Sequence, residues 1–330
     1  MAMPKTMKAL YSTISSTPTS TTPATLALAD RPIPTLASNT ALVRVHAAGI
    51  NPSDFANGAL NRFNAFKPII PGRDFAGTVV QAASRPELLG TDVYGTSGNQ
   101  ISLTCDGTHA EYIAVPFEGL VPKPEGLSWT QAGVVGVPYT TAYMLLERLN
   151  AFTGKDVILV LGATGTVGKA VVEIAKAKGC KTITASRRDG CDVNLTVDPE
   201  LEAAKVHNDG NGPDVIIDCV GSPALMEKGL AILGRRGRYG FISGMRGGGP
   251  EIKVNTMRMF SMDQSLTGLS SLSPILAEAS KVMELLRGMF NAGAIHALPE
   301  EKITKISIEE AKDAYQEAAK LEGKKFAIAF

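Results

Sequence analysis

Two patterns of apolar and polar residues divide the chain near Ser128. Before this residue, short strand-like runs are separated by glycine, proline and asparagine turns; the runs are 8–11, 41–45, 76–80, 92–95 and 110–115. After it, apolar strands alternate with helical segments, which is typical of parallel β-α-β units covered by helices on both faces of the sheet. The sequence therefore predicts an α/β protein with a β-rich first third followed by a doubly wound parallel sheet.

The elements after Ser128 follow from their periodicity and caps. Ser128 followed three residues later by Gln131 is a capping-box pattern, which predicts an apolar helix over 132–149. Strands are expected at 157–161, 181–185, 214–219, 237–242, 265–269 and 326–330, and helices at 168–178, from Pro274 to about 291, and at 308–320. The helix that usually follows the second strand is expected to be missing or much shortened after Arg188, because 189–194 runs directly toward the next region.

Length and element order predict two domains. A chain of 330 residues exceeds the size at which one hydrophobic core usually stops growing. We expect a first domain over 1–127, completed by 275–330, and a second domain over 128–274. The Ser/Thr/Pro-rich stretch 12–23 could be a flexible tail or a surface loop inside a hairpin, and strand-like residues on both sides favour the hairpin.

The most informative local motif is a glycine-rich turn that reads Gly162-Ala-Thr-Gly165-Thr-Val-Gly168. Glycine lets the chain turn sharply and lets a pyrophosphate approach the backbone amides, and the following helix N-terminus contributes partial positive charge. The strand before it and the helix after it are the context that makes such a triplet informative; a glycine-rich connection without a ligand is the alternative. The expected dinucleotide-binding residues here are Gly162, Thr164, Gly165, Thr166, Val167 and Gly168.

The end of the next strand indicates which dinucleotide binds. An NAD site usually has an acidic residue there for the ribose 2′-hydroxyl, whereas this chain reads Ser186-Arg187-Arg188. A hydroxyl and guanidinium groups would bind a 2′-phosphate through charge-assisted hydrogen bonds. The alternative is a pair of arginines that simply face solvent. The sequence favours NADPH.

Composition excludes several classes of partner. The formal net charge is +1, and Lys and Arg are scattered, so a nucleic-acid partner is not expected. No apolar run approaches the roughly 20 residues of a membrane helix, and the first ten residues lack the apolar stretch of a signal peptide. Four cysteines without a CxxC pair argue against a disulfide framework. We expect a cytoplasmic protein without a membrane partner, as a monomer or homodimer.

Several motifs in order resemble the zinc-independent quinone oxidoreductase and enoyl reductase branch of the medium-chain dehydrogenase/reductase superfamily. No single motif is decisive, but their joint order and spacing are highly specific. Besides the glycine turn they are Ala48-Gly-Ile-Asn51-Pro-Ser-Asp54, Pro71-Gly-Arg-Asp-Phe-Ala-Gly77, Gly107-Thr-His-Ala-Glu-Tyr112, Pro138-Tyr-Thr-Thr141-Ala142, Asp218-Cys-Val-Gly221 and Gly323-Lys-Lys-Phe.

The resemblance implies a GroES-like β-barrel substrate domain and a Rossmann NADPH domain, with the nicotinamide in the cleft between them. Such enzymes transfer hydride to a quinone or to the C=C bond of an α,β-unsaturated carbonyl, so the implied substrate is a small hydrophobic quinone or enone. Asn51 is expected beside the nicotinamide ribose, Thr141 at the carboxamide, and Lys324 over the cofactor. The resemblance also implies that Val220, Phe241 and Leu269 contact the cofactor. A trans-acting or tailoring enoyl reductase of secondary metabolism is one form of this function.

The resemblance also argues against zinc. Zinc alcohol dehydrogenases of the superfamily have Cys where this chain has Asn51, and a His-Glu pair where it has Arg73-Asp74. Zinc needs thiolate, imidazole or carboxylate ligands in tetrahedral geometry, so asparagine and arginine at these positions remove the site. For His46 and His109 a core or surface role is favoured over a ligand role. No metal is expected.

The proton donor and the acceptor site are left open by the sequence. Tyr139 and Tyr143 flank Thr141 and are candidate donors, and buried packing residues are the equal alternative. Asp54 is expected to orient its loop. The apolar segments 60–66 and 257–260 are candidate acceptor walls or ordinary packing residues. The rival function is a catalytically reduced NADPH-binding, sensing or structural protein of the same fold.

Overall fold

The computed structural model describes residues 3–13, 25–58, 69–152, 154–206, 208–244, 247–320 and 323–330. They form two compact units: unit 1 contains 1–140 and 272–330, and unit 2 contains 141–271. The first boundary falls within helix α3 (Gly136–Arg148). Each unit has its own main sheet, and no helix in the described ranges is both long and apolar enough to cross a membrane.

Unit 1 is built mainly of antiparallel strands. Its sheet has the order β14-β15-β3-β4-β5-β7, with β6 also paired to β3. The strands are β3 (Thr40–Ile50), β4 (Phe75–Gln81), β5 (Asp92–Gly95), β6 (Tyr112–Pro116), β7 (Val121–Pro122), β14 (Ile303–Ile306) and β15 (Lys325–Ala329). β1 (Thr6–Thr13) and β2 (Thr25–Pro32) pair antiparallel throughout, which confirms the predicted hairpin; residues 14–24 between them lie outside the described ranges.

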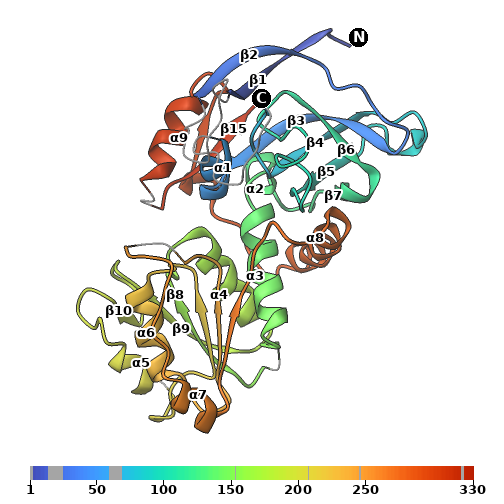
Figure 1. Ribbon diagram of the computed structural model, residues 1–330. Helices are drawn as coiled ribbons and strands as arrows, with labels where there is room; N and C mark the ends of the chain where they lie inside the picture. The colour runs from blue at the N-terminus through green and yellow to red at the C-terminus, as the bar shows by residue number, and fades with distance from the viewer. Residues whose placement is uncertain are drawn as a thin grey trace. The chain divides into compact units, whose positions relative to one another are not determined.

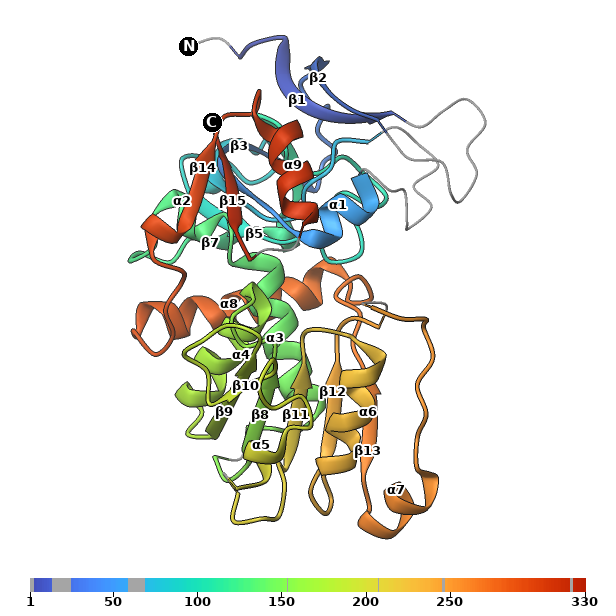
Figure 2. The same ribbon diagram turned by 90° about the vertical axis from the view of Figure 1, so that its left-hand side faces the viewer.

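Helices surround this sheet. They are α1 (Pro52–Gly58), α2 (Trp129–Ala132), α8 (Leu276–Asn291) and α9 (Ala311–Ala319), with 3-10 turns η1 (Pro86–Leu88), η2 (Phe117–Gly119) and η3 (Glu300–Lys302). Helices α1 and α9 lie side by side (Figures 1 and 2), and Phe55 packs on the apolar cluster that includes Tyr315. The capping box at Ser128 is present, but the single helix expected over 132–149 is wrong. Two helices, α2 and α3, form instead, because α2 ends at its C-cap Gly133 and a new helix begins at Gly136.

Unit 2 is a parallel six-stranded sheet of order β10-β9-β8-β11-β12-β13. Its strands are β8 (Val157–Leu161), β9 (Lys181–Ser186), β10 (Val193–Asn194), β11 (Val215–Asp218), β12 (Arg238–Phe241) and β13 (Ser265–Gly268); its helices are α4 (Thr166–Ala177), α5 (Glu202–Val206), α6 (Pro223–Ile232) and α7 (Thr256–Met262). The predicted doubly wound sheet is confirmed (Figure 2). The missing crossover helix is confirmed too, since 187–192 contains no helix.

The two faces of this sheet are covered by different helices. On one face, Ala204 of α5 and Leu230 of α6 join a core cluster with alternate strand residues such as Leu159. On the other, Leu145 of α3 and Leu149, just after the end of α3, pack so closely on β12 that a Cβ at Gly240 would lie 2.5 Å from Leu149 Cδ1. Fully apolar strands such as β8 therefore have both faces buried.

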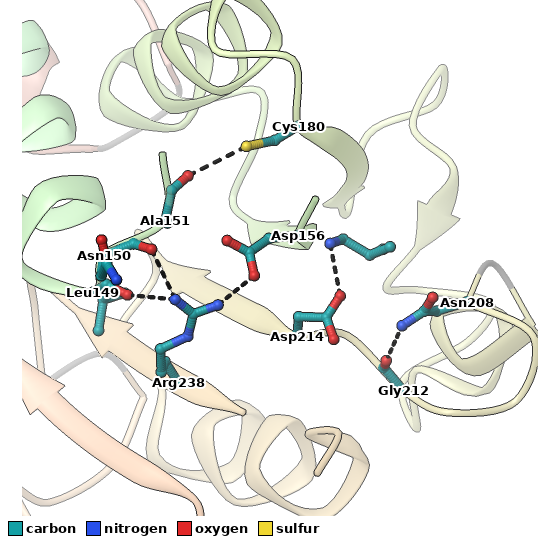
Figure 3. A network of polar contacts seen from close by, with 10 residues as sticks. Leu149, Asn150, Ala151, Asp156, Cys180, Asn208, Gly212, Asp214 and Arg238 are labelled. Atoms are coloured by element: carbon teal, nitrogen blue, oxygen red, sulfur yellow. Dashed lines mark hydrogen bonds and ion pairs between the residues drawn. The ribbon is translucent and has the colours of Figure 1, made fainter. Parts of the chain in front are cut away.

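Arg238, the first residue of β12, links the amino ends of strands in unit 2 through its side chain (Figure 3). Its guanidinium donates to the carbonyls of Leu149 and Asn150 at 2.8 and 2.9 Å, and it forms an ion pair with Asp156. Asp214 accepts the backbone N–H of Val157 at 2.8 Å. These contacts fix the end of the sheet opposite the glycine turn, so they stabilise the fold without reaching the candidate site.

Candidate functional site

The glycine turn joins β8 to α4, and its three glycines have different physical roles. Gly162 adopts φ +79°, a left-handed conformation that favours glycine. A Cβ at Gly168 would lie 2.2 Å from the Gly162 carbonyl oxygen, so only glycine permits this approach of helix to strand. Gly165 is the N-cap of α4 with φ −74°, and an added Cβ would meet only the Gly162 oxygen at 3.3 Å. Gly165 thus leaves open space at the helix N-terminus, where an anion is favoured.

The predicted cofactor residues of unit 2 gather at one edge of its sheet. Gly162, Val220 and Leu269 follow the carboxyl ends of β8, β11 and β13, while Ser186 and Phe241 end β9 and β12. This edge is where ligands bind in open parallel sheets, at the point where the strand order reverses. The reversal lies between β8 and β11, since the chain moves from β8 to β9 and later returns to β11. The Val220 side chain lies against Gly162, 2.9 Å from an ideal Cβ there.

Two hydroxyl groups connect the glycine turn with the end of β9. Thr164 Oγ1 and Ser186 Oγ are 2.8 Å apart, and Ser186 Oγ accepts the backbone N–H of Arg188 at 3.1 Å. Arg187 and Arg188 are exposed. No carboxylate side chain ends β9; Asp192 instead accepts the backbone N–H and hydroxyl of Thr184, each at 2.7 Å. Ser186, Arg187 and Arg188 therefore stand where an NAD site usually has an acidic residue at the end of this strand.

Asp218 supports the same edge, and no role was predicted for it from the sequence although it begins the motif Asp218-Cys-Val-Gly221. Its Oδ1 accepts the backbone N–H groups of Val220 and Gly221 at 2.7 and 3.0 Å, and its Oδ2 accepts the Tyr239 hydroxyl at 3.0 Å. Gly221 has φ +73°. Asp218 is fully buried, so this carboxylate sets the path of the loop that carries Val220. A buried acid directly before a Gly-containing turn is the signal that could have indicated it.

Asn51 lies in unit 1 at the centre of a buried polar network. Its Nδ2 donates to Asp74 Oδ2 at 2.8 Å, and its Oδ1 accepts from Lys325 Nζ at 2.7 Å. Asp54, three residues on, accepts the Asn51 backbone N–H at 2.8 Å, which is one half of a capping box at the start of α1. The structure thus gives Asp54 the orienting role expected for it. Burial raises the pKa of Asp54 to about 6.

The residues at the zinc-ligand positions of the superfamily are engaged in hydrogen bonds within the protein. Asp74 also accepts from Thr96 Oγ1 at 2.9 Å and the Val137 backbone N–H at 2.7 Å. Arg73 donates to Ser97 Oγ at 2.7 Å and Ser53 Oγ at 2.9 Å. The described residues contain no group of three or more His, Cys, Asp or Glu side chains that could hold a metal ion. An amide and two buried cations do not fit a zinc ion.

His109 is a buried core residue, one of the two roles expected for it. Its Nε2 lies 3.2 Å from the Gly49 carbonyl oxygen, and its Nδ1 lies 2.8 Å from the Tyr315 hydroxyl. Because the carbonyl only accepts, Nε2 carries the proton and Nδ1 accepts from the hydroxyl. Burial lowers the pKa of His109 to about 4.

The candidate proton donors are engaged in packing. The Tyr139 hydroxyl donates to the His296 carbonyl, and its ring centroid is 5.1 Å from that of Phe290. The Tyr143 ring is 5.1 Å from Phe152, and burial raises the Tyr143 pKa. These contacts favour the packing alternative for both tyrosines.

The remaining predicted positions lie in different surroundings. Thr141 Oγ1 is buried and has no hydrogen-bond partner in the described ranges. Lys324 is exposed and pairs with Glu317 at 3.0 Å, whereas the next residue, Lys325, reaches Asn51. Segment 60–66 lies outside the described ranges. Segment 257–260 belongs to α7, which packs at the amino ends of the strands through Arg236, far from the glycine turn, so it is not an acceptor wall.

The comparisons with known proteins agree with these two regions. Residues 37–125 match the alcohol dehydrogenase GroES-like domain, and residues 166–287 match the zinc-binding dehydrogenase family. A zinc-type alcohol dehydrogenase-like protein of Schizosaccharomyces pombe is 42% identical over 277 residues, covering 84% of this chain and 83% of that protein.

Two further comparisons are with a quinone oxidoreductase and with the solved structure of an enoyl reductase. The quinone oxidoreductase of Sus scrofa is 27% identical over 278 residues, covering 80% of this chain and 81% of that protein. The solved structure of an enoyl reductase, CurK, shares the fold with a TM-score of 0.76 at 20% identity, covering 99% of both chains. The expected GroES-like and Rossmann architecture is confirmed. The chain belongs to the medium-chain dehydrogenase/reductase superfamily, and over most of its length it is similar to quinone oxidoreductases of that superfamily.

Proposed function

We propose that this protein is a zinc-independent, NADPH-dependent reductase of quinones or of the C=C bond of α,β-unsaturated carbonyls. The observation that carries the NADPH assignment is the corner formed by Thr164, Ser186 and the exposed Arg187-Arg188 pair. Hydroxyl and guanidinium groups without a competing strand-end carboxylate suit a 2′-phosphate. The pyrophosphate would be held by the backbone of Gly162–Gly168 at the start of α4.

The proposal assigns further contacts to individual residues. Val220, Phe241 and Leu269 would line the dinucleotide along the strand ends of unit 2. The Thr141 hydroxyl, buried without a partner in the described ranges, suits a carboxamide that needs a hydrogen bond. Asn51 would hold the nicotinamide ribose, as its family resemblance implies. When bound, the cofactor supplies the hydride, and these residues orient it.

Zinc independence rests on the chemistry of the ligand positions rather than on the family description, which includes zinc enzymes. Asn51 and Asp74 already satisfy each other, and Arg73 and Lys325 bring positive charge to the same place. Without a Lewis acid to polarise an alcohol oxygen, alcohol oxidation is disfavoured. An acceptor that is already electrophilic, such as a quinone or enone, needs only orientation and a donor for the developing oxyanion.

The test is the oxidation of NADPH and NADH in the presence of 9,10-phenanthrenequinone or a simple enone. We expect NADPH to bind about tenfold or more tightly than NADH, and Arg187→Ala/Arg188→Ala to weaken NADPH alone, since each charge-assisted bond contributes about 1.5–3 kcal/mol. The matched control is Arg235→Ala/Lys253→Ala, which removes two exposed cations of the same unit. Equal weakening of both cofactors would contradict the NADPH assignment. Tight NADPH binding without turnover would favour the sensing or structural alternative.

A further inference from the structure

Lys325 is a buried cation whose role the reductase assignment does not yet use. It begins β15, which pairs antiparallel with the end of β3, so that Phe326 lies opposite Ile50. Its Nζ donates to the Asn51 side chain at 2.7 Å and to the Ile50 carbonyl at 3.2 Å. Only 3% of Lys325 is exposed. Lysine is almost never buried to this extent unless its charge is compensated.

The compensation comes from a closed set of charges. Asp54 and Asp74 are fully buried, and Arg73 is 2% exposed. The opposing charges of Asp74 and Asp54 act on Lys325, while its burial lowers its pKa. Two carboxylates and two cations balance, so removing one member leaves an uncompensated charge in the interior.

The same contacts determine which way the Asn51 amide points. An asparagine side chain can exchange its oxygen and nitrogen by turning over, and its orientation is set by its partners. Lys325 can only donate, so it faces Oδ1; the Asp74 carboxylate can only accept, so it faces Nδ2. Among the described residues, these contacts leave one N–H on Nδ2 and one lone pair on Oδ1 of Asn51 without a partner. Asp74 is itself held by Thr96 and the Val137 backbone, so the chain of contacts ends on fixed groups.

We propose that Lys325 is a positioning residue for the reductase reaction, in which its ammonium group holds the Asn51 carboxamide in the single orientation that meets the cofactor ribose. The proposal rests on the proposed function of Asn51. It assigns to Lys325, rather than to the exposed Lys324, the contribution of the Gly323-Lys-Lys-Phe segment to the site.

The test compares Lys325→Met with Lys305→Met. Lys305 is an exposed lysine on the neighbouring strand β14, paired with Glu300, so it is a matched control for loss of a lysine from this sheet. The first readout is hydrogen exchange of the Asn51 side-chain amide by NMR, assigned with Asn51→Asp. We expect exchange about tenfold or more faster in Lys325→Met and unchanged in Lys305→Met. Unchanged exchange in both variants would overturn the proposal.

The second readout separates positioning from stability. We expect Lys325→Met to lower kcat by about tenfold or more, with no further loss when it is added to Asn51→Ala, because one residue acts through the other. A purely structural lysine would give additive losses in the two backgrounds, and that result would also overturn the proposal. If the parent protein reduces no quinone or enone, the proposed function fails, whereas the exchange measurement still tests the Lys325–Asn51 bond.

A second variant covers the case in which Lys325→Met does not fold. Asp74→Asn/Lys325→Met removes one charge of each sign and retains one acceptor oxygen in place of the two carboxylate oxygens that serve Asn51, Thr96 and the Val137 backbone. We expect this double variant to melt at a higher temperature than Lys325→Met, and still to show fast Asn51 amide exchange and reduced kcat. Recovery of kcat together with stability would contradict a positioning role.

Discussion

The glycine turn of unit 2 and the Asn51 network of unit 1 are built by opposite means. The glycine turn consists of consecutive residues, 162–168, and acts through backbone amides and the absence of side chains. The Asn51 network consists of side chains that come from 51–54, 73–74 and 325, and its charged members are buried. The glycine turn has open space beside Gly165, whereas the Asn51 network is packed with buried charges of opposite sign.

This difference predicts how each region responds to substitution. A change at the open part of the glycine turn should affect binding more than folding, because few atoms of the protein lie against it. A change in the Asn51 network should affect folding strongly, because each buried charge depends on the others. The comparison would be wrong if substitutions in the glycine turn mainly affected folding and substitutions in the Asn51 network mainly left folding unchanged.

The largest effect is expected for Asp74→Ala. The substitution removes the acceptor for three hydrogen bonds, those of Asn51, Thr96 and the Val137 backbone, and leaves one buried carboxylate, Asp54, against the two buried cations of the network. Loss of one partner of a buried ion pair costs about 3–5 kcal/mol. Urea unfolding should therefore show a loss of this size, and a variant that is as stable as the parent would show that the network is not charge-coupled.

The pH dependence of stability should be changed by Asp54→Asn. His109, with a lowered pKa of about 4, resists protonation in the folded state, so its contribution is lost as pH falls from about 6.5 toward 4. Asp54, with a raised pKa of about 6, acts in the opposite direction, since its folded form binds the proton more readily and stability falls as pH rises from 3.8 to about 6. At about 1.4 kcal/mol per pKa unit, each amounts to roughly 3 kcal/mol.

The pH dependences of stability that arise from His109 and from Asp54 therefore offset each other in the parent protein between pH 4 and 6. Asp54→Asn keeps an acceptor for the Asn51 backbone but removes the titration. Melting temperatures across this range should rise with pH more steeply in the variant than in the parent. Parallel curves would mean that Asp54 does not hold a proton in the folded protein at these pH values.

A smaller difference in stability is expected between substitutions at two glycines of the same turn, Gly168 and Gly165. Gly168→Val should cost about 1–3 kcal/mol, because its Cβ would lie 2.2 Å from the Gly162 carbonyl oxygen. Gly165→Val should cost about 1 kcal/mol or less, since this N-cap has an ordinary φ and no side-chain cap to lose. Gly165→Val should nevertheless abolish NADPH binding in a fluorescence titration by filling the anion site. Normal binding by this variant would show that Gly162–Gly168 does not hold the dinucleotide.

The sequence predicted the parts of the molecule that depend on neighbouring residues. The strands around the glycine turn, the hairpin of β1 and β2 and the shortened crossover after Arg188 are confirmed. Their signals are local: apolar runs, turn residues and caps. The helix expected over 132–149 was wrong, because Gly133 ends α2 and the next helix starts where Asp74, distant in sequence, accepts the Val137 backbone N–H.

The contacts of the Asn51 network could not be read from spacing. Lys325 lies 274 positions from Asn51 in the chain, and only strand pairing between β15 and β3 brings them together. Lys324 and Lys325 are adjacent and have the same side chain, and the difference between them is that Lys325 begins the buried strand β15 whereas Lys324 precedes it and is exposed. The role of the Asp218 side chain could not be read from its motif for a similar reason, because its Tyr239 partner lies on another strand.

Turnover after removal of metal tests the central claim, hydride transfer from NADPH without zinc, most directly. The protein would be dialysed against EDTA, its zinc content measured by atomic emission, and NADPH oxidation followed with 9,10-phenanthrenequinone and an enone. The account predicts unchanged turnover with far less than one zinc ion per chain, because Asn51, Asp74 and Lys325 already satisfy one another. Loss of turnover on dialysis that added Zn²⁺ restores would contradict it.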